Sequence, residues 1–268
     1  MFKPRSFSAT RLPGFAAIAM LTFVMLYLPI FTLVGFSFNA GESPSIWEGF
    51  STKWYAIAFA NEQVREAAAT TLIVASLATL VATTVATMAA LGTTRRRAFK
   101  GQTWIYLAIN QPLMVPEIVT AVALLIFFAM LKKTTGYSGL GYMVLAHSAF
   151  CIPFAYLPIR ARLEGMDLTL ETAGADLYAS PWQTFRFITL PLLMPGVLAG
   201  AMLAFVTSLD TVVITEFIKS PGQDTLPSYM LGQLRRSMKP DVNAISTLLL
   251  VVTLALLTAF FLISRKRD

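Results

Sequence analysis

Residues 67–92 read AAATTLIVASLATLVATTVATMAALG and contain no charged side chain. A helix needs about 20 predominantly apolar residues to cross the hydrocarbon core of a bilayer, and this stretch is longer than that. Charged residues stand just outside it, at Arg65 and Glu66 before the stretch and at Arg95 after it. The stretch therefore predicts a transmembrane helix.

Five further stretches repeat this pattern. Apolar runs long enough to cross a membrane also lie at 14–38, 104–131, 138–159, 191–218 and 243–263. The first of these is longer than the apolar core of a signal peptide, so we expect it to remain as a span. The sequence predicts an all-α polytopic membrane protein: a tail over 1–13, one transmembrane domain with six helices over 14–264, and a tail over 265–268.

The composition supports a membrane protein and argues against other classes. The chain of 268 residues is 56% hydrophobic and only 13% charged, whereas soluble domains are about 25% charged. The net charge of +7 lies in short clusters between apolar runs, so we expect no nucleic-acid partner. One cysteine, Cys151, and one histidine, His147, leave no set for a metal site or a membrane enzyme, and we expect both to pack between helices.

The basic residues predict the orientation in the membrane. If the N-terminus is cytoplasmic, the inner segments carry Lys3, Arg5, Arg11, Arg95, Arg96, Arg97, Lys100, Arg160, Arg162, Arg186, Arg265, Lys266 and Arg267. The outer segments then carry fewer basic residues, although the loop before the last span is basic too. The positive-inside rule therefore favours a multi-pass protein with both termini in the cytoplasm.

The predicted cytoplasmic loop over 160–190 carries the most information. Leu163, Met166, Leu170, Ala173 and Leu177 recur at spacings of three and four, which predicts one amphipathic helix. Ser180-Pro181 starts a second helix with a capping box. Leu190-Pro191 is expected to end that helix, with the fifth span beginning after the break. The first helix can lie on lipid or fill a groove in a partner protein; acidic residues around it favour the protein groove.

This loop resembles the cytoplasmic signature of ABC importer permeases, the binding-protein-dependent transport family. The matching residues are Glu171, Thr172, Ala173, Gly174, Asp176, Leu177, Tyr178, Ser180 and Pro181, followed by Leu190 and Pro191. The signature is Glu-Ala-Ala, three residues, Gly, nine residues, then Ile-x-Leu-Pro. Aligned from its end, the family's Glu falls on Thr172 and its Gly on Tyr178, so that Glu171 stands one position early. The resemblance implies that this loop contacts an ATPase.

Other segments are similar to the second permease subunit of the spermidine/putrescine branch. They are Trp47 to Tyr55, Met114 to Val119, Ser208 to Val213, Leu226-Pro227 and Pro240 to Ala244. The resemblance implies a type I importer fold with six transmembrane helices and cytoplasmic coupling helices, in the bacterial inner membrane. It also implies four partners: a second homologous permease, two copies of an ATP-binding subunit and a periplasmic solute-binding protein. The chain has no Gly-x-x-x-x-Gly-Lys-Ser/Thr phosphate loop, so we expect it to bind no cofactor itself, with ATP and Mg on the ATPase.

Three carboxylates inside apolar runs are the candidate pathway residues. Glu117 lies in the third run, and Asp210 and Glu216 lie in the fifth with no Lys or Arg buried beside them. Ionisable groups at membrane depth usually face a bundle interior or a water path, so we expect a route for a cation, with Trp47 offering an aromatic face. Two alternatives remain open: Glu117 and Asp210 only hold helices together, and Glu216 is simply solvated at the boundary.

Small residues recur four apart in the fifth run, at Gly196, Gly200, Ala204 and Ser208. They permit close helix approach, either as ordinary packing or as a contact with the partner permease along the pathway. The function expected is therefore the membrane subunit of an ATP-driven importer of a polyamine or related cationic solute, working by alternating access. The alternative is a self-sufficient secondary transporter or cation channel that uses the three acids.

Overall fold

The computed structural model describes residues 14–43, 46–95, 99–236 and 240–265. The N-terminal tail 1–13, the end of the C-terminal tail and the basic residues Arg96, Arg97 and Lys239 lie outside these ranges. The orientation in the membrane, which depends on them, stays a prediction.

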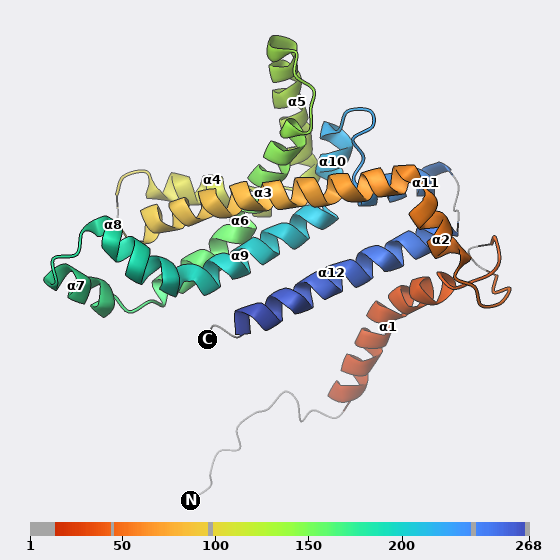
Figure 1. Ribbon diagram of the computed structural model, residues 1–268, viewed down its shortest axis with the longest axis horizontal. Coiled ribbons are helices and arrows are strands. Elements are labelled where there is room, and N and C mark those ends of the chain that lie inside the picture. The colour runs from red at the N-terminus through yellow and green to blue at the C-terminus, as the bar shows by residue number, and fades with distance from the viewer. Residues whose placement is uncertain (1–13, 44–45, 96–98, 237–239, 266–268) are drawn as a thin grey trace, which may run out of the picture. The chain divides into compact units, whose positions relative to one another are not determined.

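Almost all of the described chain is helical (Figure 1). The helices are α1 (Phe15–Phe36), α2 (Lys53–Ala60), α3 (Glu62–Thr94), α4 (Gln102–Met114), α5 (Glu117–Thr135), α6 (Gly141–Glu164), α7 (Thr169–Asp176), α8 (Pro181–Thr184), the π-helix η2 (Phe185–Thr189), α9 (Leu190–Asp210), α10 (Val213–Ile218), α11 (Leu226–Arg236) and α12 (Asp241–Arg265). The only β pairing in the described ranges is an isolated antiparallel bridge between Asn39 and Phe50. Six helical stretches there are long and apolar enough to cross a membrane, as the sequence predicts.

The chain divides into two compact units. The smaller contains residues 1–61 and 233–251, and its loop after α1 is organised around the buried side chain of Asn39. The amide nitrogen of Asn39 donates to the carbonyl of Ile46 at 2.7 Å, and the indole N–H of Trp54 donates to the carbonyl of Asn39 at 2.9 Å. The loop predicted between the first two spans is therefore an ordered structure.

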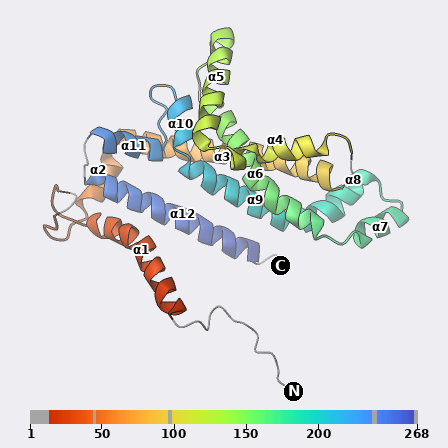
Figure 2. The same ribbon diagram turned by 180° about the vertical axis from the view of Figure 1, so that it is seen from behind.

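The larger unit contains residues 62–232 and 252–268, and its core is formed by α3, α6 and α9. These three helices run side by side in both Figure 1 and Figure 2. The side of α3 toward this core is lined by buried alanines, which are Ala75, Ala78, Ala82, Ala86 and Ala90. A face of such small side chains lets neighbouring helices approach closely, where dispersion and packing replace the hydrophobic effect in lipid.

The small residues of α9 pack against α6 of the same chain. A Cβ added at Gly200 would lie 2.5 Å from the carbonyl oxygen of Ala155, and one added at Gly196 would lie 2.6 Å from Cβ of Arg162. Ala204 and Ser208 are buried as well. The predicted close helix approach is present, and this stripe serves packing within the chain.

Two predicted spans differ from the structure. The run 104–131 is divided into α4 and α5, because Pro116 lacks a backbone N–H and disfavours helical geometry at Val115. In both views α5 points away from the direction of α3 (Figures 1 and 2). The fifth run is also divided, since α9 ends at Asp210 and α10 begins at Val213.

The loop 160–190 also differs from its prediction. α6 continues to Glu164 and buries Leu163, so the apolar stripe beginning there is divided between α6 and the separate short helix α7. The capping box at Ser180 is present. The helix that it starts is continuous with the fifth span, because the π-helix η2 ends at Thr189 and α9 begins at Leu190, with Pro191 in its first turn, where a missing N–H is tolerated. The predicted break at Leu190-Pro191 is therefore wrong.

Candidate functional site

Two helix breaks meet inside the larger unit. One separates α4 from α5 at Val115-Pro116, and the other separates α9 from α10 at Thr211-Val212, while α5 and α10 pack against each other. Non-helical backbone at membrane depth is tolerated only where protein or a water-filled cavity covers it. In transporters such discontinuous helices mark the site where solute binds.

The two breaks carry the two acidic residues that the sequence singles out. Glu117 is the first residue of α5, and Asp210 is the last residue of α9. The Glu117 carboxylate is directed at the backbone N–H of Ile214 in α10 and lies near enough to Asp210 for their charges to interact. Its Oε1 atom is buried and has no hydrogen-bond partner among the described residues, whereas Asp210 is exposed. The arrangement therefore offers one sheltered acceptor and one open carboxylate to a cation.

Hydroxyl groups stabilise the break after Asp210. The Thr211 hydroxyl donates to the carbonyl of Thr207 at 2.7 Å, and the Thr215 hydroxyl donates to the carbonyl of Thr211 at 3.0 Å. The Thr207 carbonyl also accepts from the Thr211 backbone N–H at 3.1 Å, so the Thr211 hydroxyl adds a second hydrogen bond at the end of α9. The Thr215 hydroxyl supplies a hydrogen bond to a carbonyl within the break.

The only histidine of the chain spans this break. The His147 ring on α6 lies 2.9 Å from the Ser208 hydroxyl on α9 and 3.0 Å from the Thr215 hydroxyl on α10. All three side chains are buried. His147 is thus a polar contact between helices, as expected, and Ser208 faces it instead of an open pathway.

Glu216 forms an ion pair that the sequence did not predict. The Lys219 ammonium pairs with Glu216 and with Asp224, and it also donates to Ser228 at 2.8 Å. Partial burial lowers the pKa of Lys219, but hydrogen bonds and charge from Asp224 and Glu216 outweigh this and raise the pKa above its ordinary value. The expectation that no basic residue accompanies the three acids is therefore wrong for Glu216, because the chain turns back after α10 and places Lys219 beside it.

Trp47 lies in the smaller unit. Its ring is 52% exposed and packs edge-on against Phe36 at the end of α1, with ring centroids 6.1 Å apart. An aromatic face is thus available at the surface of this unit.

The segment 165–189 forms a second candidate site, with a protruding apolar surface. Side chains exposed by half or more are Leu168, Leu170, Leu177, Tyr178, Trp182 and Phe187. Tyr178 is 96% exposed and has φ of 57°, a left-handed conformation that favours glycine. This is the position on which the signature's glycine falls, and its backbone takes a conformation that suits glycine.

Glu171 binds one residue outside this segment and one at its end. Its Oε1 atom accepts a hydrogen bond at 3.0 Å from Arg95 and another at 3.0 Å from the Thr189 hydroxyl. Of the remaining signature residues, Gly174 is buried against η2, while Thr172 donates back to the carbonyl of Leu168 within the segment. From the sequence, Arg95 serves only to predict the orientation in the membrane. No residue near Arg95 in the chain predicts its ion pair with Glu171.

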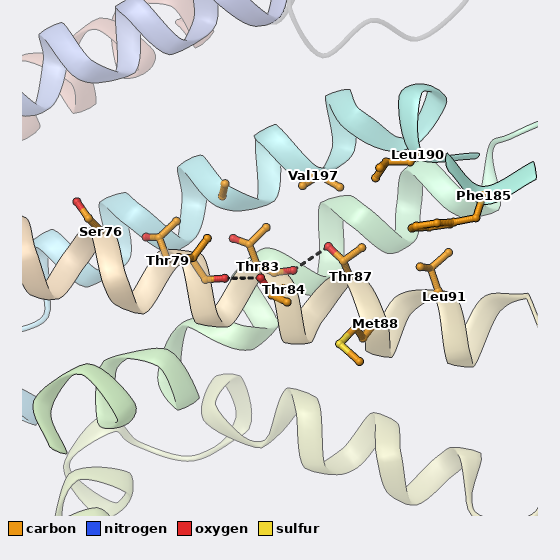
Figure 3. A pocket seen from close by; sticks show the side chains of 12 residues that line it. Ser76, Thr79, Thr83, Thr84, Thr87, Met88, Leu91, Phe185, Leu190 and Val197 are labelled. Atoms are coloured by element: carbon orange, nitrogen blue, oxygen red, sulfur yellow. Dashed lines mark hydrogen bonds between the residues drawn. The ribbon is translucent and has the colours of Figure 1, made fainter. Parts of the chain in front are cut away.

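A groove of about 560 Å³ lies between α3 and α9 (Figure 3). Its α3 side carries Ser76, Thr79, Thr83, Thr84 and Thr87. The hydroxyls of Thr84 and Thr87 donate to the carbonyls of Leu80 and Thr83, each at 2.7 Å, so they are already engaged by their own helix. The rest of the lining is mostly apolar, including Leu91, Phe185 and Val197. The groove suits an apolar occupant better than a charged solute.

The sequence matches one protein family over most of its length. The profile described as "Binding-protein-dependent transport system inner membrane component" matches residues 82–267. The chain is 34% identical over 259 residues to the putrescine transport system permease protein PotI of Escherichia coli K12, with 95% of this chain and 92% of that protein covered. It is 35% identical over 252 residues to the spermidine/putrescine transport system permease protein PotC of Haemophilus influenzae, with 94% and 96% covered.

Solved structures show the same fold. A bacterial ABC transporter involved in the import of the acidic polysaccharide alginate aligns with a TM-score of 0.71 at 16% identity, over 94% of this chain and 96% of that chain. The MetNI methionine ABC transporter, in inward-facing conformations, aligns with a TM-score of 0.64 at 17% identity, over 74% and 93%.

Proposed function

Since the chain belongs to the family of binding-protein-dependent transport system inner membrane components, we propose that it is the second permease subunit of a polyamine importer. It is a multi-pass inner membrane protein and a transport subunit, not an enzyme. The solute proposed is putrescine, spermidine or a related cationic organic molecule. The observation that carries this solute class is the meeting of Glu117 and Asp210 at two helix breaks.

The chemistry of the site suits an ammonium group. A carboxylate with a buried, unpaired oxygen gains most from a charge-assisted hydrogen bond, which is what an alkylammonium donates. Asp210 supplies a second negative charge at the exposed side of the same site. Trp47, on the smaller unit, is proposed as a separate aromatic face for a cation. Ser208 and Glu216 would support the route indirectly, because His147 and Lys219 already engage them.

The energy source proposed is a separate ATPase that holds ATP and Mg. The protruding apolar surface around Leu170, Leu177 and Tyr178 is of the kind that binds a groove in a partner protein. Two ATPase copies would dock, one on this chain and one on a homologous second permease, and a periplasmic binding protein would deliver solute. This docking requires segment 165–189 to face the cytoplasm, which is the side that the basic residues predict for it and for both termini.

Transport would proceed by alternating access. Closure of the ATPase dimer would move segment 165–189, and the attached spans would open the site at Glu117 and Asp210 to one side of the membrane at a time. The apolar groove beside α3 fits lipid or an apolar helix, so the solute would not pass through it.

Reconstitution tests this function. The chain, the second permease, the ATPase and the binding protein are placed in proteoliposomes, and uptake of radiolabelled putrescine and spermidine is measured with and without ATP. Uptake that needs ATP and all four proteins supports the proposal. Uptake by the purified chain alone, without ATPase, would establish the self-sufficient transporter instead.

Docking is tested separately with Leu170→Asp, which places a charge in the exposed apolar surface. We expect the variant to reach the membrane at normal level and to lose ATPase copurification and uptake. Glu164→Ala is the control, because Glu164 lies at the end of α6 outside this surface. Unchanged uptake by Leu170→Asp would refute docking at this surface.

A further inference from the structure

Glu171 is the only residue of α7 whose side chain binds two other described elements at once. Its Oε1 atom is shared by Arg95, which directly follows α3, and by Thr189, the last residue of η2 and the neighbour of α9. The side chains of Arg95 and Glu171 are only 20% and 22% exposed, so the pair is partly shielded from water. A shielded charge pair of this kind is stronger than one fully in solvent.

Close packing supports the same connection. A Cβ added at Gly174 of α7 would lie 2.9 Å from Cδ1 of Ile188 in η2. Met166, in the turn before α7, places its sulfur 4.0 Å from the Arg95 guanidinium. The short helix α7 is therefore held to Arg95 and to η2 by the two hydrogen bonds of Glu171 and by the apolar contact at Gly174.

The elements to which α7 is attached form one packed body. α9 contacts α6 so closely at Gly200 that no Cβ fits, and α3 packs along both helices. α9 leads directly to Asp210, the residue at the helix break. A displacement of α7 that is transmitted through Glu171 would reach this break through elements that move together.

We infer that Arg95, Glu171 and Thr189 form the mechanical connection between the ATPase-docking helix and the transmembrane spans. Arg95 and Thr189 are positioning residues: neither lies on the exposed docking surface, and both hold the docking helix to the spans that move. The inference rests on the proposed function. Beyond that function, it requires that loss of this connection uncouple ATP hydrolysis from transport while the ATPase still docks.

The test uses the reconstituted four-protein complex and measures two rates in the same vesicles: ATP hydrolysis and uptake of radiolabelled putrescine. Arg95→Glu and Glu171→Arg each place like charges together, and we expect each to lower uptake per ATP hydrolysed by about three- to thirtyfold. The double variant, Arg95→Glu with Glu171→Arg, restores the opposite charges and should recover to within about threefold of the unaltered complex. Thr189→Val removes one hydrogen bond without changing charge and should give a smaller loss of the same kind.

Arg160 and Glu164 provide a matched control. They form an ion pair at 2.7 Å within α6. Arg160 also lies over the Tyr106 ring of α4, but Glu164 itself joins no second described element and is altered alone in the control. Glu164→Arg should leave uptake per ATP unchanged.

Three results would overturn the inference. The ratio of uptake to hydrolysis could be unchanged in both single variants, the double variant could be as poor as the singles, or the ATPase could fail to copurify with the singles and with Thr189→Val. Failure of the proposed function has a different signature, since the unaltered complex would then show no ATP-dependent uptake.

Discussion

Nδ1 of His147 lies 2.9 Å from the Ser208 hydroxyl oxygen, and both side chains are buried. This contact joins α6 to the last turn of α9, just before the helix ends at Asp210. Because the other ring nitrogen lies 3.0 Å from Thr215 on α10, one imidazole holds both sides of the break. The position of Asp210 therefore depends on a residue of a different helix.

Replacing His147 with Phe should destabilise the protein, because the buried hydroxyls of Ser208 and Thr215 each lose their hydrogen bond to the imidazole, although Thr215 keeps the one to the Thr211 carbonyl. We expect a loss of about 0.5–2 kcal/mol per hydrogen bond, the range for polar contacts between membrane helices. The measurement is the midpoint of thermal unfolding in detergent. Cys151→Ala, one turn further along the buried face of α6, is the control, and equal stability of the two variants would contradict the bridging role.

Neutralising Asp210 should weaken transport of a cation. Asp210→Asn keeps the size of the side chain and removes its charge, and we expect about a tenfold rise in the KM for spermidine uptake, equivalent to about 1.4 kcal/mol. Val212→Ala lies in the same break without a charge. Equal effects of the two variants on KM would show that charge at the break does not select the solute.

A methyl group at Gly200 should disturb the core. Gly200→Ala would bring Cβ within 2.5 Å of the Ala155 carbonyl oxygen, which belongs to the backbone and cannot rotate away. We expect a destabilisation of about 1–3 kcal/mol, read from the thermal unfolding midpoint. The comparison is Gly92→Ala near the end of α3, where a Cβ meets nothing within 4 Å, so it should be neutral or slightly stabilising.

The backbone at Tyr178 should prefer glycine. Because its φ is 57°, Tyr178→Gly should relieve strain of about 1–2 kcal/mol, whereas Tyr178→Val, with a β-branched side chain, should increase it. Protease resistance of segment 165–189 in membranes reports the difference. Greater resistance in the Val variant would contradict the assignment of this strain.

Lys219 predicts loss of stability at alkaline pH. The pKa of Lys219 is raised in the folded protein, so its stabilisation is fully present below the ordinary value of about 10.4 and is lost as the pH rises through the folded value. The group is partly exposed, so the effect should be about 0.5–1 kcal/mol.

The measurement for Lys219 is the difference in unfolding midpoint between the unaltered protein and Lys219→Gln, from about pH 8 to about pH 11. The difference should be constant at the lower pH and shrink toward the upper end. A difference that grows with pH would contradict stabilisation of the charged Lys219 by Glu216 and Asp224.

Local patterns account for what the sequence predicts correctly here. The six apolar stretches and the helix start at Ser180 follow from residues close together in the chain. The helix breaks were harder to predict from the sequence. Pro116 coincides with one break, but Pro153 and Pro158 lie inside α6, which continues through both. Whether a proline interrupts a membrane helix depends on which neighbours satisfy the freed carbonyl groups.

The sequence by itself determined that this chain crosses the membrane, because the transfer of apolar side chains into lipid is a property of each segment alone. It also determined the transport family, because the matching motifs are short stretches that can be read along the chain. Only the tertiary structure decided that Arg95 pairs with Glu171, 76 residues away, and that Lys219 neutralises Glu216. It also decided that the charge of Asp210 acts on the Glu117 carboxylate, 93 positions away in the chain. Such pairings depend on how helices pack and where they break, and those outcomes are set by contacts between segments that no local pattern records.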